Sequence, residues 1–99
     1  MLNSRQRAQL RGLANSMETV LHIGKSGVGE QVIKQANDAL ESRELIKAKV
    51  LETAPEDVRK VADTIAAEVS ADVVQVIGNK FVLYRQSGNK ENRKIVLVK

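Results

Sequence analysis

The stretch Leu45–Leu51, with the sequence Leu-Ile-Lys-Ala-Lys-Val-Leu, carries the clearest strand pattern of the chain. Apolar residues at positions 46, 48 and 50 alternate with Lys47 and Lys49. Successive side chains of a strand point to opposite faces, so this alternation predicts one apolar face and one basic face. We therefore expect only one face of this strand to pack on a core.

Helical periodicity flanks this strand on both sides. Before it, the apolar spacing predicts a helix that begins near Gly29 or Glu30 and continues to about Glu41. After it, Thr53–Glu56 has the pattern of a capping box, with proline in the first turn where its missing N–H costs nothing. The apolar stripe from Val58 to Val69 predicts the long helix that this box would start.

The two ends of the chain add further elements. Asn3 or Ser4 is a suitable cap for an amphipathic helix that extends towards Met17, and Thr19–Ile23 is typical of a short strand. Near the other end, Val73–Ile77 and Phe81–Arg85 are strand-like runs separated by Gly78-Asn79-Lys80, which predicts an antiparallel hairpin.

The expected element order is α-β-α-β-α-β-β. Alternating strands and helices favour parallel pairs, whereas the hairpin adds an antiparallel pair. The fold class is therefore predicted to be α/β, with a mixed four-stranded sheet packed by helices. Residues 1–99 are expected to form a single domain, in which residues 86–99 are either a basic tail or an edge strand.

Composition and charge restrict the class of function. The chain has 99 residues and no cysteine, which excludes disulfides and zinc–thiolate sites. No apolar run approaches the roughly 20 residues of a membrane helix, so a cytoplasmic protein without membrane contact is expected. The net charge of +4 is unevenly distributed: residues 28–77 sum to −4, while residues 1–27 and 78–99 sum to +3 and +5. Such asymmetry suits a polyanion-binding surface if folding brings the ends together.

Gly24-Lys25-Ser26-Gly27 is a candidate phosphate-binding loop. Glycines let a backbone approach a phosphate closely, while Lys25, Ser26 and main-chain N–H groups supply hydrogen-bond donors. The alternative is a plain turn between a strand and a helix. A nucleotide-binding phosphate loop is excluded, because it needs glycine at the place of Thr19.

Other basic residues are candidate nucleic-acid contacts. Arg7 and Arg11 lie one helical turn apart beside the apolar stripe of the first helix. Lys47 and Lys49 share one strand face, Lys80 lies in the hairpin, and Arg85 ends its second strand with a guanidinium suited to bidentate phosphate binding. The alternative for all of them is an ordinary solvated charge.

The sequence predicts no enzyme. The one histidine, His22, has no motif that supplies a catalytic partner, so a structural role is expected for it. Ser26 lacks a recognisable base, and no cluster of residues has metal-ligand spacing. No cofactor is expected. The aromatic residues are limited to Phe81 and Tyr84, which alternation puts on opposite faces with one of them in the core, so recognition of backbone or shape is favoured over base stacking.

Four stretches together resemble the CRM domain family, in its stand-alone bacterial YhbY-type form. They are Leu10–Ala14, Ile23–Gly27, Ala39–Val50 and Val76–Arg85, which span most of the chain. Asn15 stands where relatives usually have histidine, and Asn79 where lysine is commoner.

The resemblance implies an RNA-binding domain like the C-terminal domain of translation initiation factor three. It also implies association with ribosomal RNA of large-subunit precursors and a role in large-subunit assembly. A monomer is expected. The alternatives from other classes are a protein-interaction module or a homodimer without direct RNA contact, and a DNA-binding protein, for which no recognition helix is evident.

Overall fold

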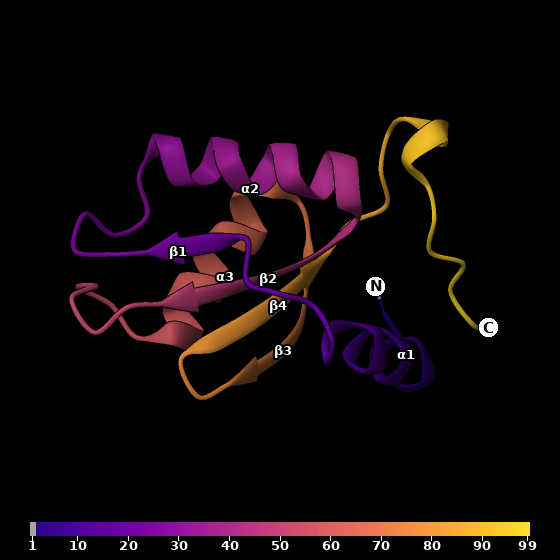
Figure 1. Cartoon of the computed structure of the whole chain (residues 1–99), viewed down its shortest axis with the longest axis horizontal. Coiled ribbons are helices and arrows are strands. Elements are labelled where there is room, and N and C mark those ends of the chain that lie inside the picture. The colour runs from indigo at the N-terminus through magenta and orange to yellow at the C-terminus, as the bar shows by residue number, and fades with distance from the viewer. Residues whose placement is uncertain (1) are drawn as a thin grey trace.

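The structure is a computed structural model that describes residues 2–99 (Figure 1). Three α-helices, four strands and one 3-10 turn follow one another along these residues. Their bounds are α1 Ser4–Ala14, β1 Leu21–Ile23, α2 Glu30–Arg43, β2 Leu45–Val50, α3 Val58–Val69, β3 Asp72–Ile77, β4 Lys80–Tyr84 and η1 Lys90–Asn92. The predicted α-β-α-β-α-β-β order is confirmed.

The four strands form one mixed sheet in the order β1-β2-β4-β3. β1 and β2 are parallel because α2 returns the chain across one face of the sheet before β2 begins. β4 lies between β2 and β3 and is antiparallel to both. The carboxyl ends of β1 and β2 and the turn between β3 and β4 therefore meet at one end of the sheet.

One face of the sheet is covered by α2 and α3 and holds the larger core (Figure 1). Ile46, Ala48 and Phe81 are completely buried there, beneath Leu40 of α2 and Ile65 of α3. The apolar side predicted for β2 is thus the core side. Each large apolar side chain buried in this layer contributes about 1.5–3 kcal/mol, which makes this layer the main source of stability.

The opposite face is covered in part by α1. There, Leu10 and Ala14 of α1 pack on Leu45, Val82 and Tyr84 in a second core. α1 begins as predicted, since Asn3 caps it and shares a capping box with Gln6. Because α1 ends at Ala14, the rest of this face has no helix over it.

Phe81 and Tyr84 lie on opposite faces of β4, as the alternation predicts. Both are buried, one in each core, so neither offers a ring to solvent. This is more burial than the sequence indicated, because α1 covers the face that Tyr84 occupies.

Two local predictions are corrected. The capping box at Thr53–Glu56 is wrong: α3 begins at Val58, and the carboxylate of Asp57 accepts from the main-chain N–H of Lys60 at 2.8 Å. The β3–β4 turn consists of Gly78 and Asn79 alone, because Lys80 is already paired with Ile77. Gly78 has φ +59°, which suits a two-residue hairpin turn.

Residues 86–99 do not add a strand. After η1 the chain follows an extended path along α1, where side-chain amides take the place of a strand partner. Gln9 accepts from the main-chain N–H of Val98 at 2.9 Å and donates to the carbonyl of Val96 at 2.8 Å. Ile95 and Leu97 pack on the second core, so this segment belongs to the folded domain.

No helix formed by residues 2–99 combines the length and the apolar content that a membrane span requires.

Candidate nucleic-acid interface

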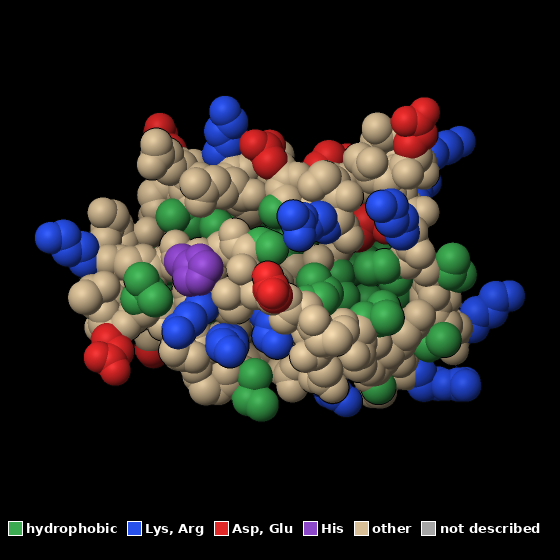
Figure 2. Space-filling model, in the orientation of Figure 1, with side chains coloured by type: hydrophobic (Ala, Val, Ile, Leu, Met, Phe, Trp, Pro, Cys, Tyr) green, Lys and Arg blue, Asp and Glu red, His purple; other side chains and the backbone are tan. Residues whose placement is uncertain are grey.

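The uncovered part of the sheet presents lysine and histidine side chains from neighbouring strands. His22 of β1 pairs with Lys49 of β2, and Lys49 pairs with Lys80 of β4. Residues directly opposite in adjacent strands share a face, so these three form one row. Lys47 precedes Lys49 by two residues and therefore lies on the same face. We call His22, Lys47, Lys49 and Lys80 the basic face; the purple histidine and neighbouring blue side chains mark it in Figure 2.

Lys49 and Lys80 are directly opposite each other in an antiparallel pair. Like charges in that position repel and destabilise a sheet by some tenths of a kcal/mol. The ion pairs within residues 2–99 are Arg59–Asp63, Lys60–Glu56 and Arg85–Glu41, so no residue of the basic face forms an ion pair with a carboxylate. The row therefore keeps an uncompensated positive charge.

Lys47 lies where the basic face meets α1. Its ammonium donates at 3.3 Å to the carbonyl of Ala14, which also accepts from the main-chain N–H of Met17 at 3.0 Å. An ammonium has three donors, which leaves two for a ligand. A shallow hollow of about 360 Å³ adjoins it, lined among others by Asn15, Gln75 and Lys80.

The Gly24–Gly27 loop is a tight turn at the same end of the sheet. The main-chain N–H of Gly27 donates to the carbonyl of Gly24 at 2.9 Å, which places Lys25 and Ser26 at the exposed corners. Over residues 2–99, the N–H groups of these two residues have no acceptor in the protein. The turn thus presents unpaired donors together with an ammonium, which is the chemistry that binds a phosphate.

The two glycines of this loop have different structural roles. Gly27 has φ +66°, and a Cβ there would meet Pro55 at 3.1 Å, so the fold itself requires this glycine. Gly24 has an ordinary φ, and a Cβ there would meet its nearest neighbour, Leu51, at 3.7 Å. The turn interpretation therefore explains Gly27 and leaves Gly24 without a structural reason.

Arginine side chains named from the sequence have internal partners. The guanidinium of Arg85 donates to the carbonyl of Val69 at 2.9 Å, to Asn37 Oδ1 at 2.7 Å and to Glu41 at 3.0 Å, so it ties β4 to both α2 and α3. Arg7 donates to the carbonyls of Val73 and Val74, where β3 bulges away from β4.

The remaining candidate arginine is Arg11, which is exposed in the last turn of α1. There its charge complements the helix dipole. Of the residues named from the sequence, the structure brings Lys47, Lys49 and Lys80 together on one face, with the Gly24–Gly27 loop at the same end of the sheet, and leaves Arg7 and Arg85 outside this group.

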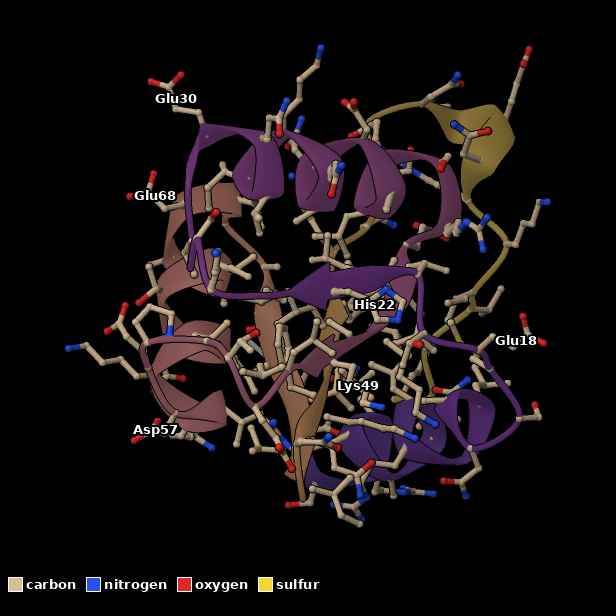
Figure 3. All side chains as sticks on the ribbon, turned by 60° about the vertical axis from the view of Figure 1, so that its left-hand side comes forward. Glu18, His22, Glu30, Lys49, Asp57 and Glu68 are labelled. Atoms are coloured by element: carbon tan, nitrogen blue, oxygen red, sulfur yellow. The ribbon has the colours of Figure 1, made fainter. Side chains whose placement is uncertain are left out.

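Another hollow lies on the side of the molecule that α2 and α3 cover. It has a volume of about 570 Å³ between α2 and α3, with Ile33 and Val69 in its lining and Glu30 and Glu68 among its polar residues. Figure 3 shows Glu30 at the start of α2 and Glu68 near the end of α3, on the same side of the view. The lining of this groove has these two carboxylates and one cation, Lys34, so the groove is not suited to a polyanion.

Sequence reasoning gave His22 a structural role, but its ring is exposed and forms a hydrogen bond with Thr19 Oγ1 at 3.3 Å. Figure 3 shows His22 beside Lys49. Alternation along β1 puts His22 on the face opposite to that of the buried Ile23. Only the register of β1 and β2 shows that this is the face of Lys49. No group of histidines and carboxylates able to hold a metal ion occurs in the described part of the chain.

Comparison with protein families gives a match to the CRS1/YhbY (CRM) domain over residues 2–85. The chain is 42% identical over 97 residues to the probable RNA-binding protein YqeI of Bacillus subtilis, a match that covers 98% of this chain and 99% of the relative. It is 38% identical over 86 residues to an RNA-binding protein of Haemophilus influenzae, with 87% of each chain covered.

A solved structure has the same fold. The solution structure of the hypothetical protein SAV1595 from Staphylococcus aureus matches with a TM-score of 0.78 and 38% sequence identity. The match covers 97% of this chain and 100% of that protein. The mixed α/β architecture is therefore shared with a sequence relative of similar length.

Proposed function

This chain belongs to the CRS1/YhbY (CRM) domain family, and we propose from that premise that it is a non-catalytic RNA-binding protein. Its ligand is the phosphate backbone of folded RNA, held by the basic face and by the exposed corner of the Gly24–Gly27 loop. Relatives named as RNA-binding proteins support the class of ligand. The geometry supports the choice of surface.

The observation that carries this proposal is the pairing of Lys49 with Lys80. Two lysines directly opposite each other, without a carboxylate partner, weaken the sheet that contains them. A phosphate placed between the two ammonium groups would replace this repulsion by attraction. Lys25 and the main-chain donors of the loop lie at the same end of the sheet and extend the surface.

Contact with the backbone is favoured over stacking on aromatic rings. Phe81 and Tyr84 are 0% and 5% exposed, so neither provides a platform for a base. Ammonium groups bind phosphate as point charges and read no base sequence. The basic face is therefore suited to the shape and charge of a folded RNA.

We further propose that the RNA is ribosomal RNA of large-subunit precursors, and that the protein assists assembly in the cytoplasm as a monomer. This step follows the family resemblance of Leu10–Ala14, Ile23–Gly27, Ala39–Val50 and Val76–Arg85. The names of the relatives as RNA-binding proteins support a role without catalysis.

Co-sedimentation of the protein with ribosomal particles on a gradient tests both steps. The wild-type chain is compared with a Lys25→Asp, Ser26→Asp variant that is shown by circular dichroism to be folded. Lys34→Asp is the matched control, because Lys34 is exposed on α2, away from the basic face. We expect the wild type and the control to travel with large-subunit precursors and the loop variant to stay at the top.

The other outcomes are equally informative. If the loop variant travels with the wild type, the loop is only a turn, and a Lys49→Gln, Lys80→Gln variant then locates the contact. If the wild type does not associate with ribosomal particles, the assembly role is wrong. Steep salt dependence and a preference for structured RNA over other polyanions then distinguish RNA binding from a protein partner or a homodimer.

A further inference from the structure

A second surface feature, an apolar hollow of about 380 Å³, lies between α1, the end of α2 and the C-terminal segment. Leu13, Met17, Leu45 and Ile95 line it. Leu13 is 46% exposed, Met17 and Ile95 are partly buried, and Leu45 forms the buried floor. Figure 2 shows this hollow as the largest group of green side chains on the visible side. A concave apolar site of this kind is typical of ligand pockets.

Two cations stand at the rim of this hollow. Arg43 ends α2 and Lys94 precedes Ile95, and both side chains are exposed. Neither takes part in an ion pair with another residue of the 2–99 range. An apolar floor with a cationic rim is complementary to a ligand that combines a flat, weakly polar group with negative charge.

The hollow and the basic face lie on the same side of the molecule. β2 runs through both, since Leu45 forms the floor of the hollow and Lys47 and Lys49 follow on the same strand face. Two residues of a strand span roughly 6.6 Å, so the path from Leu45 to Lys49 is about 13 Å long. Figure 2 shows both features facing the viewer. One RNA can therefore cover both.

We propose that the hollow binds an unpaired base of the RNA that the basic face holds, with the flanking phosphates on Arg43 and Lys94. This inference rests on the proposed function and adds a base-binding site to it. Apolar side chains contact unstacked bases in other nucleic-acid complexes, and specific RNA recognition targets bulges and loops whose bases are free. The hollow thus supplies what the buried aromatic residues do not.

The test compares two hairpin RNAs that differ by one bulged adenosine in the stem. Binding of each to the full chain is measured by fluorescence anisotropy at a fixed salt concentration. Because the hollow removes the face of an unstacked base from water, the wild type is expected to bind the bulged RNA at least about fivefold more tightly than the fully paired RNA.

Three variants separate the hollow from the basic face. Leu13→Gln, Met17→Gln, called the floor variant, makes the apolar lining above Leu45 polar. It is expected to bring the two affinities within twofold of each other, with binding of the paired RNA unchanged. Arg43→Gln, Lys94→Gln changes only exposed side chains, so it tests the rim even if the first variant unfolds. Val96→Gln is the control, since Val96 is 84% exposed and lies outside the hollow.

The proposal is overturned if the wild type binds both RNAs equally, or if the floor and rim variants keep the preference. A labelled peptide of alternating leucine and glutamate provides a further test. If this peptide binds the wild type but not the floor variant, the hollow is assigned to a protein partner, and the proposal is also overturned. A Lys49→Gln, Lys80→Gln variant should weaken the binding of both RNAs and keep the ratio of the two affinities. If the wild type binds neither RNA, the proposed function fails together with this inference.

Discussion

Glu44 accepts a hydrogen bond from the main-chain N–H of Ser87 at 2.8 Å, although its side chain is completely buried. The same carboxylate also accepts from the main-chain N–H of Lys94 at 2.9 Å. Glu44 has φ +65°, a backbone conformation that costs a non-glycine residue free energy. A buried carboxylate and an unfavourable backbone are retained together because this side chain fastens the C-terminal segment to the domain.

Replacement of Glu44 by glutamine is expected to lower the free energy of unfolding by about 2–4 kcal/mol. Glutamine has the same shape, but its NH₂ group cannot accept, so buried N–H groups that the carboxylate satisfied are left without a full partner. Urea denaturation measures the loss, and hydrogen exchange at Ser87 and Lys94 localises it. Unchanged protection at both amides would contradict this role for Glu44.

Glu41 provides a second, pH-dependent attachment. The hydroxyl of Ser87 and the main-chain N–H of Gly88 hydrogen-bond to its carboxylate and hold its pKa below the ordinary value of 4.5. A lowered folded-state pKa adds stability that is complete above the ordinary value and is lost as the pH falls through the folded-state pKa. The C-terminal segment is therefore expected to loosen in acid.

A comparison of the wild type with Glu41→Gln at several pH values tests this attachment. The wild type should be the more stable protein at pH 7, and the difference should decrease below about pH 4.5. Thermal unfolding from pH 7 to pH 3 measures it. A difference that stays constant over this range would show that the charge of Glu41 is not the cause.

These attachments explain which parts of the fold the sequence could not predict. Helices and strands arise from local periodicity, so the stripe of Val58–Val69 and the alternation of Leu45–Leu51 were sufficient to locate them. The hydrogen bonds of Glu44 join residues that are separated by 43 to 51 positions in the chain, so no local sequence pattern indicates them. The sequence alone therefore predicts either a tail or an edge strand for the C-terminal segment.

In the candidate site, too, local patterns predict some features and tertiary packing determines the rest. Alternation placed Lys47 and Lys49 on one face, but the row of His22, Lys49 and Lys80 depends on the register of three strands. Arg85 was named for its guanidinium, whereas its actual neighbours are Asn37 and Val69 on two separate helices. Residue type indicates what a side chain can bind, and only packing decides whether it is free to do so.

The pairing of Lys49 with Lys80 predicts opposite effects on stability and on binding. Lys49→Gln should raise the free energy of unfolding by about 0.2–1 kcal/mol, because it removes the repulsion of like charges. The same variant should weaken RNA binding and reduce the slope of log K against log salt by about 1. Urea denaturation and anisotropy titrations at several salt concentrations measure the two effects.

Lys34→Gln is the matched control for that experiment, since Lys34 is exposed on α2 and makes no ion pair within residues 2–99. It should leave RNA affinity and salt slope close to the wild-type values. Equal losses of affinity in both variants would indicate a response to net charge rather than contact at the basic face.

The two glycines of the loop allow folding and binding to be separated. Gly27→Ala is expected to destabilise the protein by about 1–2 kcal/mol, because φ is +66° and the new methyl group would meet Pro55 at 3.1 Å. Gly24→Ala has only ordinary contacts, the nearest at 3.7 Å from Leu51, so its stability should be close to that of the wild type. A weaker affinity for structured RNA in Gly24→Ala would then come from the methyl group that keeps a phosphate away from the turn. Retained affinity would mean that Lys25 reaches the RNA without close approach of the backbone, and Lys25→Gln would have to account for the whole contribution of the loop.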